Sequence, residues 1–337
     1  MKKTRITPLL WIALALLPIT VSLISLCIGR MPVTISDVLQ SFGAKLFGTT
    51  PCAPLIESTI WRSRLPRILL ALLGGAGLSV SGLVFQSLFA NPLATPDTLG
   101  VASGASFGAA LGILLGLPFL GVQFAALVMG LAALALTFLA GRNKRERGMT
   151  SIVLAGIMMS SLFSALVSFV KFTADTDDVL PAITYFLMGT LNGAGYDSLL
   201  LGAPPILLGL IVLYLLRFRL GLLPLGEEEA KAAGIRLRAL RLVVMVCAAL
   251  MTASCVSMCG QVGWVGLLVP HICRMIFGSD HRKLLPASIL LGSAFLVAVD
   301  TAARSITAAE LPISVLTAVL GAPFFILLMR KSGKSFF

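Results

Sequence analysis

Few side chains in this 337-residue sequence could support acid–base, nucleophilic or metal chemistry. The two histidines, His271 and His281, stand apart, and the usual zinc-protease, dithiol and serine-hydrolase spacings do not occur. The nearest approach to a phosphate-binding loop is Ser332-Gly333-Lys334-Ser335, which lacks the glycine five residues before the lysine and a following helix. We therefore predict that the chain is not an enzyme, holds no metal and binds no cofactor itself.

One acidic residue, Asp300, lies well inside an apolar segment, and Arg304 follows it by one helical turn. An i, i+4 ion pair between the two would neutralise both charges. For Asp300 a structural pair, a docking or gating role and a proton relay remain open. Ion-coupled carriers need ionisable groups within the membrane, so the scarcity of acids inside apolar segments disfavours a secondary transporter.

The composition is that of a membrane protein, because 58% of the residues are hydrophobic and only 12% are charged. A soluble domain carries about 25% charged residues. Apolar runs of about 20 residues are long enough to cross a bilayer as helices. We predict an all-α polytopic membrane protein with ten spans, near residues 8–29, 66–88, 98–117, 119–140, 150–170, 198–216, 240–259, 262–277, 284–303 and 311–329.

The net charge of +12 would suit a nucleic-acid-binding protein if the chain were soluble. Here the basic residues form short clusters between apolar runs, which is typical of positive-inside loops, so we predict a lipid environment and no nucleic acid. With the N-terminus in the cytoplasm, most of the 26 lysines and arginines fall on the cytoplasmic side, at 2–5, 142–147, 217–241, 274–283 and 330–334. Both termini are therefore predicted to be cytoplasmic.

Two connecting segments carry unusual charge. The predicted cytoplasmic loop 217–239 has three consecutive acids, Glu227–Glu229, which favour a helix N-terminus, and Gly234, which can end that short helix. Such a helix suits docking into a groove on a partner, although a solvated connector also fits. On the outer side, Arg62, Arg64 and Arg67 oppose the positive-inside trend, which indicates either a partner or ligand bearing carboxylates or contact with lipid phosphates.

Small residues crowd two of the predicted spans. Gly104, Gly108, Gly112 and Gly116 repeat at every fourth position, and residues 74–82 are rich in glycine, alanine and serine. Helices in lipid associate closely through small residues. We therefore predict a compact bundle of many helices.

Six segments follow one another in order over nearly the whole chain: R-L-P-R at 64–67, G-L-V-F-Q-S-L-F-A-N-P-L-A-T-P-D-T-L-G-V-A-S-G-A at 82–105, L-G-E-E-E-A-K-A-A-G-I at 225–235, G-W-V-G-L-L-V-P-H-I-C-R at 263–274, D-T-A-A-R at 300–304 and G-A-P-F-F at 321–325. Together they resemble the iron-chelate and vitamin B12 permease family of the type II ABC importers. The resemblance implies one transmembrane permease domain over residues 1–337, with the type II ABC importer permease fold.

The family pattern also implies partners and roles. It implies a homodimer with a central pathway, two cytoplasmic ATPase subunits that use ATP and Mg, and one extracytoplasmic substrate-binding protein. Span five, near 150–170, would line the pathway. Three groups of residues match functional positions of the family: binding-protein docking by Arg64, Arg67 and Arg304; ATPase coupling, within loop 217–239, by Leu225, Gly226, Glu227, Glu228, Ala230 and Gly234; and a cytoplasmic gate at Met149, Thr150 and Ser151.

The cargo implied by the resemblance is an iron siderophore or a similar metal chelate, moved across the bacterial cytoplasmic membrane by alternating access. Cobalamin, haem and molybdate remain open as cargo within the same class. A dimer of two different permeases remains open beside the homodimer. An ion-coupled secondary transporter is the alternative from another class.

Overall fold

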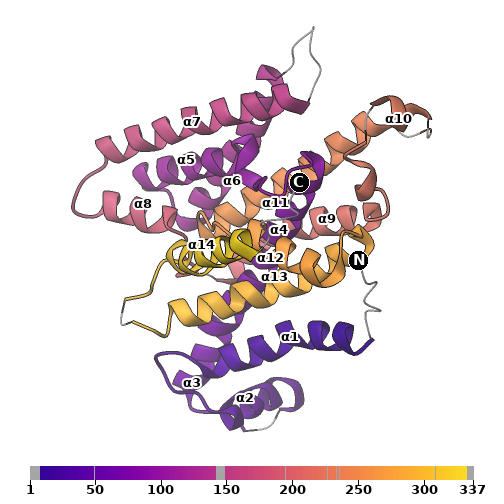
Figure 1. Cartoon of the computed structure of the whole chain (residues 1–337). Coiled ribbons are helices and arrows are strands. Elements are labelled where there is room, and N and C mark those ends of the chain that lie inside the picture. Colours follow the sequence, from indigo (N-terminus) through magenta and orange to yellow (C-terminus); the bar gives the residue numbers. More distant parts are fainter. Residues whose placement is uncertain are drawn as a thin grey trace.

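The computed structural model describes residues 8–48, 50–141, 149–193, 195–225, 227–232, 234, 236–307 and 309–331. Within these ranges every regular element is a helix, which confirms the predicted all-α class (Figure 1). Seven helices are long and apolar enough to cross a membrane: α1 (Pro8–Cys27), α4 (Leu65–Leu88), α6 (Phe119–Ala140), α7 (Met149–Thr173), α9 (Tyr196–Leu216), α11 (Leu237–Cys259) and α13 (His281–Ala303). Three shorter apolar helices are α5 (Val101–Leu114), α12 (Val265–Phe277) and α14 (Ile313–Lys331).

Each of the ten predicted spans overlaps one of these ten helices, because a helix satisfies all its backbone polar groups within the segment and is therefore favoured in lipid. The remaining elements are short and lie between the spans: α2 (Ile35–Phe47), α3 (Pro54–Ser58), the π-helix η1 (Thr59–Arg64), the 3₁₀ turns η2 (Pro96–Leu99) and η3 (Leu220–Leu222), α8 (Val179–Leu187) and α10 (Glu227–Ala232). The structure thus adds a π-turn directly before α4 that apolar periodicity did not predict.

The short helix α2 begins at a capping box. Thr34 accepts the N–H of Asp37 at 3.2 Å, and the Asp37 carboxylate accepts the N–H of Thr34 at 2.8 Å. The Thr34 hydroxyl, which donates to the Asp37 carboxylate at 2.7 Å, and the Thr34 N–H lower the pKa of Asp37. Gly48 ends the helix with φ +69°, in the left-handed region that glycine adopts without strain. The cap therefore fixes where the chain turns after α1.

Helix α4 is the centre of the bundle and contacts α9, α11, α12 and α13. Its glycines allow two very close crossings. A Cβ on Gly75 would lie 2.2 Å from the carbonyl oxygen of Gly292 in α13, and a Cβ on Gly82 would lie 1.8 Å from that of Gly266 in α12. In lipid such close backbone approach replaces the hydrophobic effect as the source of helix association.

Helices α5 and α6 use the same device. A Cβ on Gly104 or Gly108 would lie within 2.9 Å of α6 atoms, and one on Gly112 would lie 3.1 Å from the Cα of Val122. The fourth glycine of the repeat, Gly116, differs from the predicted pattern: α5 ends before it, its φ is +66°, and open space surrounds it. Gly116 therefore follows the end of α5 and makes no close contact with another helix.

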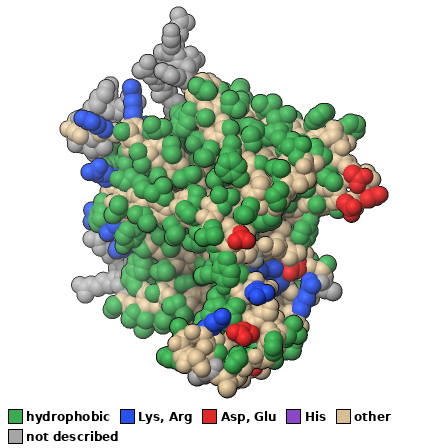
Figure 2. All heavy atoms as spheres, turned by 180° about the vertical axis from the view of Figure 1, so that it is seen from behind, with side chains coloured by type: hydrophobic (Ala, Val, Ile, Leu, Met, Phe, Trp, Pro, Cys, Tyr) green, Lys and Arg blue, Asp and Glu red, His purple; other side chains and the backbone are tan. Residues whose placement is uncertain are grey.

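The two ends of the bundle differ in what they carry. Figure 1 shows the start of α1 and α10 at one end, here named the α10 end, and α8 at the other, the α8 end. From behind, Figure 2 shows many lysines and arginines along the α10 end, acidic groups at the opposite edge, and a broad hydrophobic surface between them. The exposed acids Asp175, Asp177 and Asp178 immediately precede α8.

Candidate functional site

Helix α7, the predicted pathway span, presents a polar stripe away from the rest of the subunit. Its inward face contains Ala155, Phe163 and Val170, all buried. The opposite face carries exposed hydroxyls at helical spacing, namely those of Thr150, Ser161, Ser164 and Ser168. These four hydroxyls, here called the polar stripe, share the exposed face with Leu154, Ile157 and Phe172. The face is therefore mixed in polarity and suits contact with another protein chain, with water or with lipid.

Two of these hydroxyls are satisfied within the helix itself. Ser161 Oγ donates to the Ile157 carbonyl and Ser168 Oγ donates to the Ser164 carbonyl, both at 3.0 Å. Their oxygen lone pairs remain free on the outer surface. Of the predicted gate residues, Thr150 is exposed and Ser151 is half-buried in the first turn of α7, while the side chain of Met149 lies outside the described part of the chain.

The predicted coupling segment forms the short helix expected from its sequence. Helix α10 begins at Glu227, and Gly234 follows it with φ +70°. Ala230 is buried and Leu225 is half-buried. Gly226 and the side chains of Glu227 and Glu228 lie outside the described part of the chain.

Arg241 of α11 anchors the start of this segment. Its guanidinium donates to the carbonyls of Leu223 at 2.9 Å and Leu225 at 2.8 Å. Helix α10 also contacts α11, so a force applied to α10 would reach the long helix α11. The backbone geometry therefore fits a coupling element, and the coupling role itself stays a prediction.

The three predicted docking arginines come together beside the last turn of α1, and all three are buried: Arg64 is 4% exposed, Arg67 8% and Arg304 8%. Arg64 donates to the backbone carbonyls of Leu26 and Met31. Gly29 leaves room for this arrangement, since a Cβ there would lie 2.7 Å from an Arg64 nitrogen and 3.1 Å from one of Arg304.

Arg67 forms the strongest contacts of the cluster. Its Nη2 and Nε lie 2.7 Å and 2.9 Å from Asp300 Oδ1, and its Nη1 lies 3.0 Å from Glu310 Oε1. Charge-assisted, bidentate arginine–carboxylate pairs are the strong ones among side-chain hydrogen bonds. Asp300 therefore belongs to a structural ion pair, but its main partner is Arg67 of α4 rather than the predicted Arg304.

Arg304 is held mainly by α1. Its Nη2 donates to the hydroxyl of Ser25 at 2.8 Å and to the Ser25 carbonyl, while its Nε lies 3.8 Å from Asp300 Oδ2. The cluster thus ties α1, α4, α13 and the loop carrying Glu310 together. The exposed cations nearby in the chain are Arg30 and Arg62. Docking by the three buried arginines stays a prediction.

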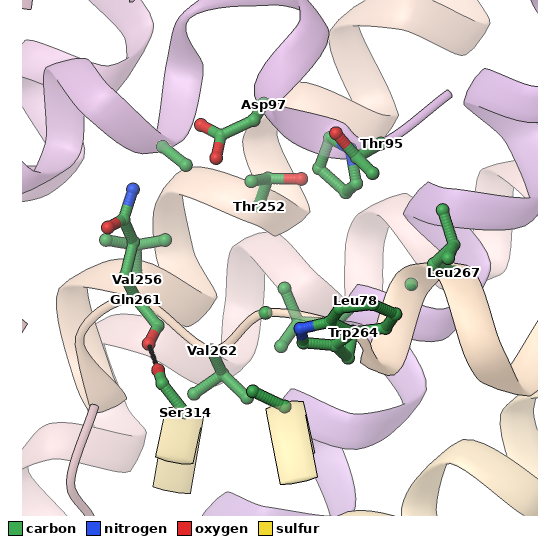
Figure 3. A pocket seen from close by; sticks show the side chains of 15 residues that line it. Leu78, Thr95, Asp97, Thr252, Val256, Gln261, Val262, Trp264, Leu267 and Ser314 are labelled. Atoms are coloured by element: carbon green, nitrogen blue, oxygen red, sulfur yellow. Dashed lines mark hydrogen bonds between the residues drawn. The ribbon is translucent and has the colours of Figure 1, made fainter. Parts of the chain in front are cut away.

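A polar cavity lies within the helix bundle beside α7, and no motif in the sequence marked it as a site (Figure 3). It measures about 340 Å³ and is lined by η2, α4, α5, α11, the loop before α12, the start of α12 and the start of α14. Its polar lining residues are Thr95, Asp97, Thr252, Gln261, Trp264 and Ser314. Asp97 falls within the recognised 82–105 segment, and the exposed position of its carboxylate could be found only from the structure.

The described residues contain no group of three or more histidine, cysteine, aspartate or glutamate side chains able to hold a metal ion. Both described histidines have ordinary structural surroundings: His281 Nε2 lies 2.6 Å from Ser87 Oγ, and His271 stacks near Phe325. The arrangement therefore offers surfaces, a polar stripe and a cavity rather than a catalytic constellation.

Known proteins resemble this chain over almost its full length. Residues 16–331 match the model of the FecCD transport family. The molybdate import system permease protein MolB of Haemophilus influenzae is 40% identical over 324 residues, which cover 96% of each chain. The "probable iron chelatin transport system permease protein" of Helicobacter pylori is 40% identical over 277 residues, covering 80% of this chain and 82% of that one.

A solved structure agrees with the fold. An inward-facing transporter assigned to the metal-chelate type of ABC transporter superposes with a TM-score of 0.87 at 39% identity, covering 96% of this chain and all of the other. The predicted type II importer permease fold is thereby confirmed, and the ion-coupled alternative does not fit this family. The chain belongs to the FecCD transport family and is a membrane-spanning permease of the ABC importers.

Proposed function

We propose that this chain is the permease subunit of an ATP-driven, binding-protein-dependent importer that carries an iron chelate across the bacterial cytoplasmic membrane. The observation that carries the proposal is the family match over residues 16–331. A permease needs a path for its cargo through the membrane, and the exposed hydroxyls of α7 would form part of one wall of that path.

The distribution of charge supports an orientation. Arg217 and Arg219 lie in the segment between α9 and α10, and Arg241 contacts the segment directly before α10. The acids at 175, 177 and 178 directly precede α8, at the other end of the bundle (Figure 1). Figure 2 shows a row of lysines and arginines along the α10 end. Positive loops face the cytoplasm. The proposed orientation therefore puts the α10 end, and with it both termini, in the cytoplasm.

Each surface then has a proposed partner. A second copy of the chain would cover the exposed faces of α7 and α14 and enclose the pathway between two subunits. Two ATPase subunits would engage α10 from the cytoplasm, and a substrate-binding protein would dock at the α8 end, where Arg30 and Arg62 are exposed. Charge complementarity at that end would set the rate and register of docking more than its affinity.

The transport cycle would be a population shift between two packings of the bundle. ATP and Mg would be used only by the ATPase subunits. Closure of those subunits would move α10, and the bonds from Arg241 to Leu223 and Leu225 would pass that motion to α11. This chain would bind and release the cargo without changing its covalent structure.

The iron chelate is proposed as cargo because the α7 face carries no charged side chain between Thr150 and Lys171. A chelate shields the charge of its metal, so it can pass a surface of hydroxyls and hydrocarbon without a compensating charge. The Helicobacter relative named for iron chelatin and the metal-chelate type structure agree with this choice.

Molybdate is the second candidate, favoured by one observation. The Haemophilus permease named for molybdate is similar over 96% of this chain, whereas the iron chelatin relative covers 80%. Serine hydroxyls can also donate to an oxyanion. Cobalamin and haem remain open as bulkier cargoes.

Uptake into proteoliposomes tests the proposal. The vesicles would hold the permease with its ATPase and binding protein, and ferric siderophores, haem, cobalamin and molybdate would each be supplied with and without ATP. ATP-dependent accumulation of a ferric siderophore is the expected result. Accumulation of molybdate alone would transfer the proposal to the second candidate, and accumulation driven by an ion gradient without ATPase would refute the importer mechanism.

A further inference from the structure

The cavity of Figure 3 has a mainly apolar lining with one carboxylate and no basic side chain, and the amide of Gln261 and the indole N–H of Trp264 are neutral donors in its wall. Asp97 supplies a carboxylate, which is exposed within the isolated subunit. Thr252 Oγ1 donates its proton to the Ala248 carbonyl at 2.8 Å, and Ser314 Oγ donates to the Gln261 carbonyl. With their protons engaged, both hydroxyl oxygens can only accept from a ligand.

The walls of the cavity are held in place by contacts outside it. η2 is fastened to the first half of α7, because Ser160 Oγ donates to the Asp97 carbonyl at 3.1 Å. On the opposite wall, Trp264 has φ +67°, and its ring lies so close to α14 that a Cβ on Gly321 would be 2.5 Å from it. A non-glycine residue with positive φ is strained, so the surrounding structure must hold Trp264 in this conformation.

The simplest alternative role for Asp97 is local. Asp97 stands in η2 directly before α5, where a carboxylate can serve as an acceptor for the N–H groups of the first helical turn. Such a role leaves acceptor capacity, because a carboxylate has two oxygens and about four lone-pair sites. Figure 3 shows the carboxylate pointing toward the cavity, on the side where Gln261 and Thr252 lie.

We propose that this cavity is a transit site for the cargo and that it selects a chelate presenting ammonium, hydroxyl or amide N–H donors over an oxyanion. The site would accept hydrogen bonds at Asp97, Thr252 and Ser314 and would pack the apolar part of the ligand against Trp264. A dianion would meet a carboxylate with no cation to offset it. This inference rests on the proposed importer function and narrows its cargo.

The metal itself would not be coordinated there. The described residues offer no set of three metal-ligating side chains, and the cavity contributes one carboxylate. The cavity would therefore bind the outer groups of the chelate, while the metal stays enclosed by the chelate.

Equilibrium dialysis tests the proposal directly. The permease–ATPase complex in nanodiscs, without binding protein, would be dialysed against radio-iron ferrioxamine B, which carries one free ammonium group, against its neutral N-acetylated form with the same ferric core, and against molybdate. The variants would be Asp97→Asn, which keeps an acceptor for capping α5, and Asp280→Asn. Asp280 caps α13 by accepting the Arg282 N–H at 3.0 Å, outside the cavity, and serves as the matched control.

The wild type should bind ferrioxamine B more tightly than the acetylated form and should not bind molybdate. Asp97→Asn should weaken the binding of ferrioxamine B by about tenfold, which is the scale of one charge-assisted hydrogen bond. The same substitution should change the affinity for the acetylated form by no more than about twofold. Asp280→Asn should change neither. Equal binding of ferrioxamine B by wild type and Asp97→Asn, a preference for the neutral form or for molybdate, or no binding of either iron probe would overturn the proposal.

The result can be separated from the test of function. If the full importer fails to accumulate any iron chelate while the Asp97-dependent preference for the cationic probe persists, the proposed cargo is wrong and the cavity assignment stands. If iron chelates accumulate and the Asp97→Asn importer shows no loss of affinity for the cationic probe, the importer function stands and the cavity is only a structural void.

Discussion

Helices α4 and α7 have nearly the same hydropathy and use the same small residues, yet they occupy opposite environments. In the most apolar window of the segment containing α4, 83% of the residues are buried inside the subunit, against 17% for α7. Glycine and serine in α4 face other helices, whereas Ser161, Ser164 and Ser168 of α7 face outward. The same residue types therefore pack a core in one helix and line a surface in the other.

The difference teaches how to interpret small residues in a membrane protein. In α4 they lie against neighbouring backbones, as Gly75 does with Gly292, and the gain is van der Waals contact. In α7 the serines at 161, 164 and 168 are exposed on the surface of the subunit. Substitution should consequently cost stability in α4 and transport in α7, and the following variants test that contrast from the largest expected change in unfolding free energy to the smallest.

Arg67→Met in α4 should have the largest effect, a loss of about 3–5 kcal/mol, because it removes the closest charge partner of the buried Asp300 and leaves only Arg304 at 3.8 Å. Thermal unfolding of the purified protein in detergent, followed by size exclusion, measures this. Combining it with Asp300→Leu should recover part of the loss, since the orphan charge is then removed. If the single variant unfolds at the wild-type temperature, the ion pair is not part of what stabilises the bundle.

This first prediction also bears on docking. If an Arg67 variant binds the substrate-binding protein weakly, this is evidence for docking only when the variant also unfolds at the wild-type temperature. Arg67 is only 8% exposed, so its replacement can weaken binding by disturbing the fold. Charge reversal of the exposed Arg62 is the cleaner probe. It should weaken docking more at low salt than at high salt, and equal binding under both conditions would argue against an electrostatic contact there.

Gly82→Ala should be next, with a loss of about 1–3 kcal/mol. The new methyl group would lie 1.8 Å from the Gly266 carbonyl oxygen, so α4 and α12 must separate. Gly263→Ala is the matched control, because a Cβ at that position has nothing within 4 Å. The same unfolding assay compares the two, and equal stability of the variants would show that the close crossing has no energetic role.

Ser81→Ala and Ser168→Ala form a matched pair from the two helices. Ser81 is fully buried and donates to the Ala248 carbonyl of α11 at 3.1 Å, so its loss should cost about 1 kcal/mol. Ser168 is exposed and bonds only within α7, so its replacement should change stability by less than about 0.5 kcal/mol. Urea unfolding of both variants measures these losses. A larger loss of stability for Ser168→Ala than for Ser81→Ala would contradict the contrast between the two helices.

Ser164→Leu in α7 should have the smallest effect on stability, within about 0.5 kcal/mol, and a large effect on transport. The added side chain would project from the polar stripe into the proposed pathway, so ATP-dependent uptake should fall severalfold while ATP hydrolysis continues. Ser164→Ala is the control and should retain uptake. Normal uptake by the leucine variant would place the pathway on another face of the subunit.

Much of this protein follows from its sequence. The ten apolar helices were predictable, because a long run of apolar residues in lipid forms a helix that satisfies its own backbone polar groups. The short acidic helix that Gly234 follows was predicted from its acidic first turn and its glycine. The glycine repeat of α5 was predicted correctly at three of its four positions. These features depend on residues close together in the chain, and local chemistry determines them.

Only the tertiary structure decided the rest. Asp300 lies close enough to Arg304 for the predicted ion pair, at 3.8 Å, but its shortest contact is with Arg67, 233 positions away in sequence, at 2.7 Å. The three arginines, predicted to face a partner, are engaged by backbone carbonyls and carboxylates from α1, α13 and the following loop. The cavity draws on seven separate segments of the chain. Such contacts depend on which helices pack together, and in lipid that choice rests on shape and hydrogen bonding between distant segments, which hydrophobicity along the chain does not record.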